Sequence, residues 1–201
     1  MLFRSDSVGL GGLPNEEGVV ELDASCMHGP TRRAGSAGGV RNIRTMAELA
    51  REVMNHSGHV MLVGEGAERF AVARGMKREN LLTEETRKVW LLWKESHSDW
   101  WGPGVSSPRW RERFKERTAD EHLEYHERLQ RLAEDLGIDP KVRAAAIHKI
   151  LFPPTGTIHC STLAANGDMS GCTTTSGLAW KIPGRLGDSP DRKSTRLNSS
   201  H

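Results

Sequence analysis

Residues 155–190 constrain the fold of this chain more than any other stretch. Two prolines, Pro153 and Pro154, end the helix before it, and an apolar-alternating strand then carries Thr157. An Asn-Gly-Asp sequence at 166–168 predicts a tight hairpin turn, after which the chain returns through Met169–Thr175. The stretch therefore predicts two antiparallel strands, with Thr157 at the start of the first.

The first half of the chain alternates between strand-like and helix-like patterns. Thr45 and Glu48 have the spacing of a capping box at the start of one expected helix. A glycine-rich stretch through Gly39 precedes that helix. The alternation predicts an α+β fold in which helices pack on a sheet. The expected elements are a strand over Val19–Met27, a helix over Arg44–Asn55, a short buried strand over His59–Gly64 and a helix over Ala67–Arg74 that Gly75 ends.

The region from Lys94 to Pro154 has a different character. It is densely charged, and the helix expected over Ala119–Leu136 is polar. Three leucines give this helix one thin apolar stripe, at Leu129, Leu132 and Leu136. We interpret the region as a partly solvated linker rather than as a second domain.

Composition limits the classes of protein to which the chain can belong. Its 201 residues are 36% apolar, which is enough for one domain with a core. A net charge of +2 argues against a nucleic-acid partner, which normally needs a concentrated basic face. No apolar run reaches the ~20 residues of a membrane helix, and the start of the chain lacks the apolar core of a signal peptide. Three cysteines without metal-type spacing leave the compartment open.

Thr157 is a candidate nucleophile because it follows Gly156 at the start of a strand. A threonine hydroxyl hardly ionises near neutral pH and needs a base. A threonine at a chain terminus carries that base in its own α-amine, which has an ordinary pKa of ~8. The mechanism therefore requires cleavage between Gly156 and Thr157. An ordinary strand threonine is the commoner explanation of any single Gly-Thr pair.

Residues after the Gly156–Thr157 pair support its interpretation as part of a catalytic site. Thr175 follows in a threonine cluster, and a Gly-Arg-x-Gly-Asp-Ser-Pro sequence then contains Arg185 and Asp188. An arginine can fork both oxygens of an α-carboxylate, and an aspartate can pair an α-ammonium. The order resembles the start of the second subunit of glycosylasparaginases, which are N-terminal-nucleophile hydrolases of the asparaginase-2-like type. The resemblance covers residues 7–95 and 155–190.

This resemblance implies a fold and an activity. The fold would be the four-layer αββα sandwich of N-terminal-nucleophile hydrolases, cut into two subunits at Gly156–Thr157. Thr157 and Thr175 would be catalytic, and Arg185 and Asp188 would bind the free amino acid end of the substrate. The enzyme would hydrolyse the side-chain amide of glycosylated asparagine and release aspartate. A plant-type L-asparaginase or isoaspartyl peptidase is the alternative, and Gly156 stands where better-studied members have aspartate.

The resemblance also bears on partners. It implies a small-molecule substrate, no cofactor, no metal, and a homodimer of cleaved protomers in the full-length protein. Nucleic acid and membrane are not expected as partners. A bacterial periplasm and a cytoplasm are both open as locations.

The resemblance divides the chain into four parts. Residues 1–95 correspond to the first-subunit core without its upstream strand, 96–156 to a linker and the end of that subunit, and 157–190 to the start of the second subunit. Residues 191–201 resemble translated sequencing-adapter read-through, with a native disordered tail as the alternative. On this basis we expect a sequence truncated at both ends. It lacks the Thr-Gly pair of the family's oxyanion hole, and the short chain would be an inactive fragment.

Two weaker patterns are incomplete, and we expect neither nucleotide binding nor zinc binding from them. Gly64-Glu65-Gly66 lacks the third glycine of a dinucleotide-binding loop. His122 and His126 lie one helical turn apart, but no third zinc ligand is evident. We expect a packed helix end from the tryptophans and core positions for two of the cysteines. The residues concerned are Trp90, Trp93, Trp100, Trp101, Cys160 and Cys172.

Overall fold

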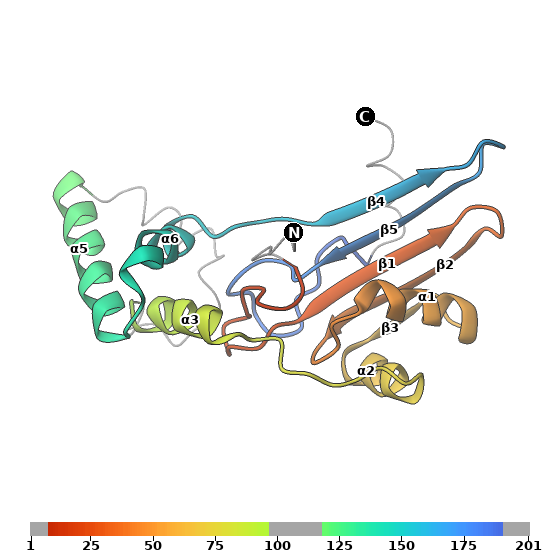
Figure 1. Ribbon diagram of the computed structural model, residues 1–201, viewed down its shortest axis with the longest axis horizontal. Helices are drawn as coiled ribbons and strands as arrows, with labels where there is room; N and C mark the ends of the chain where they lie inside the picture. Colours follow the sequence, from red (N-terminus) through yellow and green to blue (C-terminus); the bar gives the residue numbers. More distant parts are fainter. Residues whose placement is uncertain (1–7, 97–117, 191–201) are drawn as a thin grey trace.

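A computed structural model describes residues 8–96 and 118–190 of the chain. Trp100, Trp101 and the predicted tail at 191–201 lie outside the described residues. The fold is mixed α+β, as the sequence predicts (Figure 1). A five-stranded sheet has helices along one face, and three further helices lie beyond one end of its strands.

The strand order in the sheet is β3-β2-β1-β5-β4. β2 and β3 are parallel, and the other three pairs are antiparallel. Residues far apart in the sequence therefore meet at the centre of the sheet, where β1 pairs with β5. The strands are β1 (Leu22–His28), β2 (Arg33–Val40), β3 (Met61–Val63), β4 (Ile158–Leu163) and β5 (Met169–Thr175).

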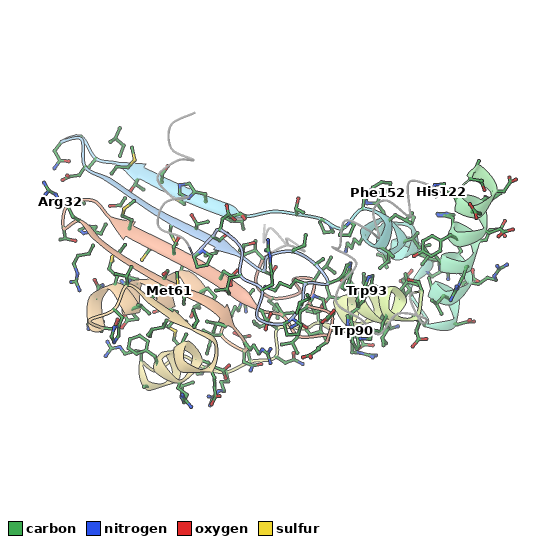
Figure 2. All side chains as sticks on the ribbon, turned by 180° about the vertical axis from the view of Figure 1, so that it is seen from behind. Arg32, Met61, Trp90, Trp93, His122 and Phe152 are labelled. Carbon is green, nitrogen blue, oxygen red and sulfur yellow. The ribbon has the colours of Figure 1, made fainter. Side chains whose placement is uncertain are left out.

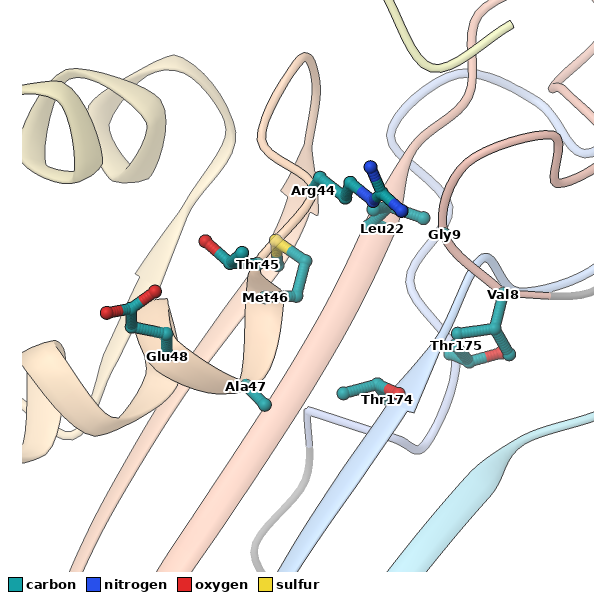
Figure 3. Close-up of a pocket in the computed structure, with 10 residues that line it drawn as sticks. All are labelled: Val8, Gly9, Leu22, Arg44, Thr45, Met46, Ala47, Glu48, Thr174 and Thr175. Atoms are coloured by element: carbon teal, nitrogen blue, oxygen red, sulfur yellow. The ribbon is translucent and has the colours of Figure 1, made fainter. Parts of the chain in front are cut away.

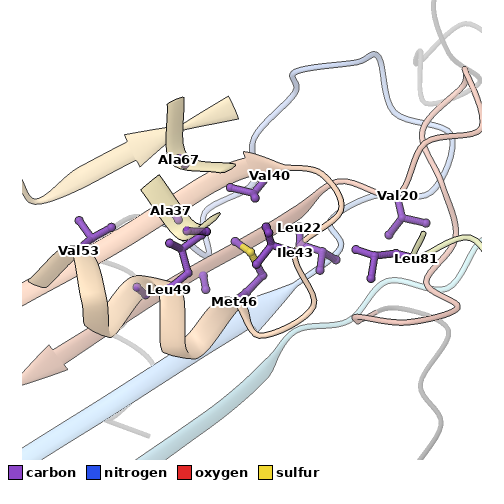
Figure 4. Packing of buried hydrophobic residues seen from close by; sticks show 13 residues of the cluster. Val20, Leu22, Ala37, Val40, Ile43, Met46, Leu49, Val53, Ala67 and Leu81 are labelled. Atoms are coloured by element: carbon purple, nitrogen blue, oxygen red, sulfur yellow. The ribbon is translucent and has the colours of Figure 1, made fainter. Parts of the chain in front are cut away.

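The helices α1 (Met46–His56) and α2 (Gly64–Ala73) cover one face of the sheet. Leu22 and Ala24 of β1 belong to the same buried cluster as Leu49 and Val53 of α1. Figure 4 shows Leu22, Leu49 and Val53 among the side chains of this cluster. These side chains are 0–2% exposed. Burying a side chain the size of leucine stabilises a fold by about 1.5–3 kcal/mol. This cluster is therefore the main core under the sheet.

The sequence prediction missed β2, because its glycine-rich composition is typical of a loop. The structure shows the reason for one of these glycines. A Cβ added at Gly35 would lie 2.2 Å from the carbonyl oxygen of Ala50 and 2.5 Å from the backbone nitrogen of Met54, both in α1. Glycine thus lets α1 approach the strand closely.

Three local predictions in the first half were wrong in part. β1 begins at Leu22 and not at Val19. β3 is an edge strand rather than a buried one, with Met61 42% exposed and Val63 52% exposed. Thr45 does precede α1, but its side chain makes no capping hydrogen bond, because its backbone lies outside the usual cap geometry. Gly75 follows α2 with a φ of 88°, as expected for a helix end.

A second hydrophobic cluster holds the helices α3 (Glu84–Ser96), α5 (Ala119–Asp135) and α6 (Pro140–Leu151) together. Trp93 of α3 stacks on Trp180, with ring centroids 5.0 Å apart and an interplanar angle of 4°. Figure 2 shows Trp90 and Trp93 between the sheet and the helix that carries His122. The apolar stripe of α5 is therefore part of a packed core, which the interpretation as a partly solvated linker did not foresee.

The hairpin between β4 and β5 matches the sequence prediction. Gly167 has a φ of 87°, and its N–H donates to the carbonyl oxygen of Ala164. Asn-Gly sequences favour such turns because glycine tolerates positive φ. The hairpin places residues 157 and 175 next to each other at its open end.

Candidate active site

Thr157 directly precedes β4 and is exposed. The register pairs Ile158 with Thr174, so Thr157 lies opposite Thr175. Side chains alternate between the two faces of a strand. Because Asp23 of β1 pairs with Thr175, the side chains of Asp23, Thr175 and Thr157 share the face opposite to α1. The two residues predicted to be catalytic, Thr157 and Thr175, therefore lie next to each other.

The Thr175 hydroxyl contacts the peptide bond before Thr157. Its Oγ1 donates to the carbonyl oxygen of Gly156 at 2.8 Å and accepts from the N–H of Gly177 at 2.9 Å. The Thr175 side chain is buried, whereas Gly156 is exposed, so the bond between them is partly buried. The resemblance implied that Thr175 is catalytic together with Thr157. In this uncut chain the Thr175 hydroxyl contacts the carbonyl of the Gly156–Thr157 bond.

The Thr157 hydroxyl lies near a serine to which sequence reasoning gave no role. The Oγ1 of Thr157 is 3.4 Å from the Oγ of Ser189, which is buried. Ser189 belongs to the Gly-Arg-x-Gly-Asp-Ser-Pro sequence, so the motif was visible but the contact was not. The loop at 182–190 thus folds back onto the start of β4.

Arg185 and Asp188 lie on this loop, and both are exposed. The backbone N–H of Arg185 donates to the carbonyl of Ile182 at 3.0 Å, and Gly184 between them has a φ of 83°. The Arg185 guanidinium makes no ion pair with any residue in the described ranges. Its donors are thus accessible to a ligand.

A buried lysine lies between Thr175 and Arg185 in the sequence. The Nζ of Lys181 donates to the carbonyl of Ser176 at 3.2 Å and lies 3.9 Å from a carboxylate oxygen of Glu21. Both side chains are 1% exposed. Burial lowers the pKa of Lys181, while the charges of Asp23 and Glu21 act in the opposite direction. Sequence reasoning missed this pair, because Glu21 and Lys181 are distant along the chain.

His159 is another residue that the sequence analysis did not single out. It lies two positions after Thr157, so its side chain is on the same face of the sheet. Its Nδ1 is 2.8 Å from the Oγ1 of Thr173, and its Nε2 is buried without a partner among the described residues. The face that carries Thr157 is thus lined by polar side chains.

The cavity in Figure 3, of about 400 Å³, lies beside the start of α1. Leu22, Met46 and Thr174 line it, which places it on the helix-covered side of the sheet. Thr175 also lines it, whereas Arg185 and the hydroxyl of Thr157 belong to the opposite face. We therefore do not take this cavity as the site of the threonine chemistry.

The cysteines differ from the sequence expectation. Cys160 is exposed on β4 and Cys172 is half-buried on β5, so Cys160 is not a core residue. The reason is that α1 covers β1 and β2 but leaves β4 open. In the described ranges, no group of three or more histidines, cysteines or acidic residues is arranged to hold a metal ion. No helix there is long and apolar enough to span a membrane.

Comparison with known proteins identifies the family. The sequence model of a family described as asparaginase matches residues 4–191. A putative N(4)-(beta-N-acetylglucosaminyl)-L-asparaginase of Drosophila yakuba is 34% identical over 194 residues, which cover 92% of this chain and 43% of that protein. Proteins named N(4)-(beta-N-acetylglucosaminyl)-L-asparaginase from Elizabethkingia miricola and Rattus norvegicus are 34% and 32% identical, over 92% of this chain in each case. The chain covers 40% and 48% of their lengths, respectively. The chain therefore belongs to the asparaginase family.

Proposed function

We propose that this chain forms part of an amidohydrolase that cuts itself between Gly156 and Thr157. The cut protein then hydrolyses the side-chain amide of glycosylated asparagine and releases aspartate. Membership of the asparaginase family supports this proposal, as do the names of its relatives. The observation that carries it is the hydrogen bond from the Thr175 hydroxyl to the carbonyl oxygen of Gly156.

That hydrogen bond would stabilise the charge that develops on the Gly156 carbonyl oxygen during self-cleavage. The Thr157 oxygen attacks the Gly156 carbonyl carbon, and negative charge develops on the oxygen that Thr175 contacts. A donor aimed at such an oxygen contributes about 2.7–4 kcal/mol to lowering the barrier. The C–N bond breaks, the hydroxyl proton passes to the departing amine, and an ester forms on Thr157. Water then hydrolyses the ester, which leaves a Gly156 carboxylate and a free Thr157.

The same threonine serves as the nucleophile for the substrate. Its new α-amine takes the proton from its hydroxyl, and the oxygen attacks the side-chain amide carbon of the substrate. The amine departs with a proton, and aspartate remains bound to Thr157 as an ester. Water releases the aspartate and restores the hydroxyl. Thr175, which borders Thr157 across the hairpin, stays in place as a donor to the reacting centre.

Arg185 and Asp188 recognise the amino acid end of the substrate in this proposal. Arg185 forks the α-carboxylate with two N–H groups, and Asp188 pairs with the α-ammonium. Their exposure on one short loop, close to Thr157 through Ser189, supports the assignment. An asparagine inside a peptide has neither charged group and is refused.

We also propose the finer architecture that the family resemblance implies. Residues up to Gly156 form the first subunit and residues from Thr157 begin the second, within a four-layer αββα sandwich. The complete enzyme is a homodimer of cleaved protomers. The polar face of the sheet, opposite to α1 and α2, supports this architecture, because it bears the residues that act on the substrate.

Steady-state kinetics of the complete gene product tests the proposed activity. We expect aspartate release from glycosylasparagine, and little release when the α-amine is acetylated or the α-carboxylate amidated. Arg185→Lys raises KM, because lysine cannot fork two oxygens. Equal turnover of blocked and free substrates contradicts the assignment of Arg185 and Asp188. Preferred hydrolysis of β-aspartyl dipeptides or free asparagine identifies the isoaspartyl peptidase or asparaginase alternative instead.

A further inference from the structure

Three polar side chains alternate along one face of the chain at β1. Glu21, Asp23 and Ser25 are 2%, 0% and 2% exposed, so all are buried. Their neighbours Leu22 and Ala24 point into the apolar cluster under α1. Residues two apart in a strand share a face. The three polar groups therefore form a row on the face that also carries Thr175.

Each member of this row makes a hydrogen bond to the backbone of the loop at 182–190. The two carboxylate oxygens of Glu21 accept from the N–H of Gly184 at 3.2 and 3.4 Å. An oxygen of Asp23 accepts from the N–H of Gly187 at 3.4 Å. The Ser25 hydroxyl donates to the carbonyl oxygen of Ser189 at 2.7 Å.

The three anchored residues flank the two substrate-binding candidates. Gly184 directly precedes Arg185, and Gly187 and Ser189 stand on either side of Asp188. The guanidinium of Arg185 also lies over this part of the loop, since a Cβ added at Gly187 would be 3.3 Å from its Nη1. The row thus fixes the backbone at the points from which both side chains emerge.

Asp23 is itself held in place. Its other carboxylate oxygen accepts from the N–H of Gly39 at 2.8 Å, at the end of β2. A carboxylate has two acceptor oxygens, and Asp23 uses one for Gly39 of β2 and the other for Gly187 of the loop. The carboxylate therefore joins the centre of the sheet to the loop with a defined orientation.

We propose that Glu21, Asp23 and Ser25 are positioning residues that set the spacing of Arg185 and Asp188 for the two charged groups of the substrate. This inference rests on the proposed function. The row precedes the Gly156–Thr157 bond and the loop follows it, so the substrate clamp depends on both pieces after cleavage. Misplacing binding groups by about 1 Å can cost ~100-fold in rate.

Asp23→Asn in the complete gene product tests the inference. An asparagine side chain has one acceptor oxygen, so it can serve Gly39 or Gly187 but not both. We expect unchanged self-cleavage and a KM for glycosylasparagine raised about tenfold, because one partly buried N–H then loses its acceptor and the loop shifts. The increase is smaller for an α-amidated substrate, because that substrate has already lost its contact with Arg185. Glu48→Gln, an exposed carboxylate on α1, is the control and leaves KM unchanged.

A matched pair at Ser25 covers the case in which Asp23→Asn does not fold. Ser25→Thr keeps the hydroxyl and Ser25→Val replaces it with a methyl group of similar size. We expect a higher KM in the valine variant than in the threonine variant. Wild-type KM in folded, cleaved Asp23→Asn protein, or equal KM in the Ser25 pair, overturns the inference. Absence of aspartate release by the unmutated protein overturns the proposed function itself, and this result needs no variant.

Discussion

The two faces of the five-stranded sheet differ in chemistry, although the same strands build both. On one face, Leu22 and Ala24 meet α1 and α2 in an apolar cluster. On the other, Asp23 and Ser25 contact a loop through hydrogen bonds, and Thr175 contacts the Gly156 carbonyl. The alternation of strand side chains lets one segment serve both needs. Stability therefore depends mainly on the face that α1 and α2 cover, and the proposed chemistry depends on the opposite face.

The largest expected effect is on the apolar face. Leu49 is 0% exposed, so Leu49→Ala removes buried methyl groups and leaves a cavity. We expect the free energy of unfolding to fall by about 2–5 kcal/mol. Chemical denaturation of the complete protein measures it. Leu163→Ala is the control, because Leu163 is 68% exposed and its loss changes stability by no more than about 0.5 kcal/mol.

A threonine pair compares the two faces directly. Thr175→Val removes the donor to the Gly156 carbonyl and slows self-cleavage about 100- to 1,000-fold. Thr174→Val changes the adjacent residue, whose side chain lies on the opposite face, and leaves the rate unchanged. Gel analysis of freshly made protein over time gives both rates. Equally slow self-cleavage in the two variants would contradict the assignment of separate functions to the two faces.

Thiol labelling reports which part of the helix-side face is covered. Burial, together with the neighbouring Cys172 thiol, raises the pKa of Cys26 to about 11. Its reactive thiolate is therefore scarce at pH 8, and we expect alkylation about 100-fold slower than in the unfolded chain. Raising the pH toward 11 increases this rate. Cys160, which is exposed, serves as the internal comparison and reacts first. Faster labelling of Cys26 than of Cys160 contradicts the described packing.

The smallest effect tests how closely α1 packs on β2. Gly35→Ala places a methyl group against the backbone of α1 and costs about 1–3 kcal/mol of unfolding free energy. Gly66→Ala in α2 meets no atom within 4 Å and stabilises the helix by about 0.5–1 kcal/mol. Thermal unfolding measures both effects. The melting temperature falls in Gly35→Ala and rises in Gly66→Ala if α1 packs on β2 as described.

Sequence patterns predicted the elements whose signals are local. The Asn-Gly pair predicted the β4–β5 hairpin, and the helix-like pattern over Arg44–Asn55 predicted α1. They missed β2, because the need for Gly35 arises only when α1 packs against it. The sequence predicted that Trp93 packs at a helix end, which the structure confirms. It did not predict the stacking of Trp93 on Trp180, since these residues are far apart in the chain.

The candidate site shows the same limit. The family resemblance supplied Thr157, Thr175, Arg185 and Asp188 as candidates, because all four lie within one stretch of the sequence that resembles the family. The bond from Thr175 to the Gly156 carbonyl was not visible there, because it depends on how the hairpin closes. The contact of Asp23 with the loop could not be predicted for a related reason, since its partner Gly187 is distant in the sequence. Motifs can therefore indicate candidate residues, whereas the contacts that hold those residues in place appear only in the fold.

The mass of the purified complete gene product tests the central claim most directly. The account predicts two fragments, one ending at Gly156 and one beginning at Thr157, and a single uncut chain for Thr157→Ala. Mass spectrometry with N-terminal sequencing resolves both. An unmutated protein that stays uncut, or a Thr157→Ala variant cut at the same bond, would contradict the account.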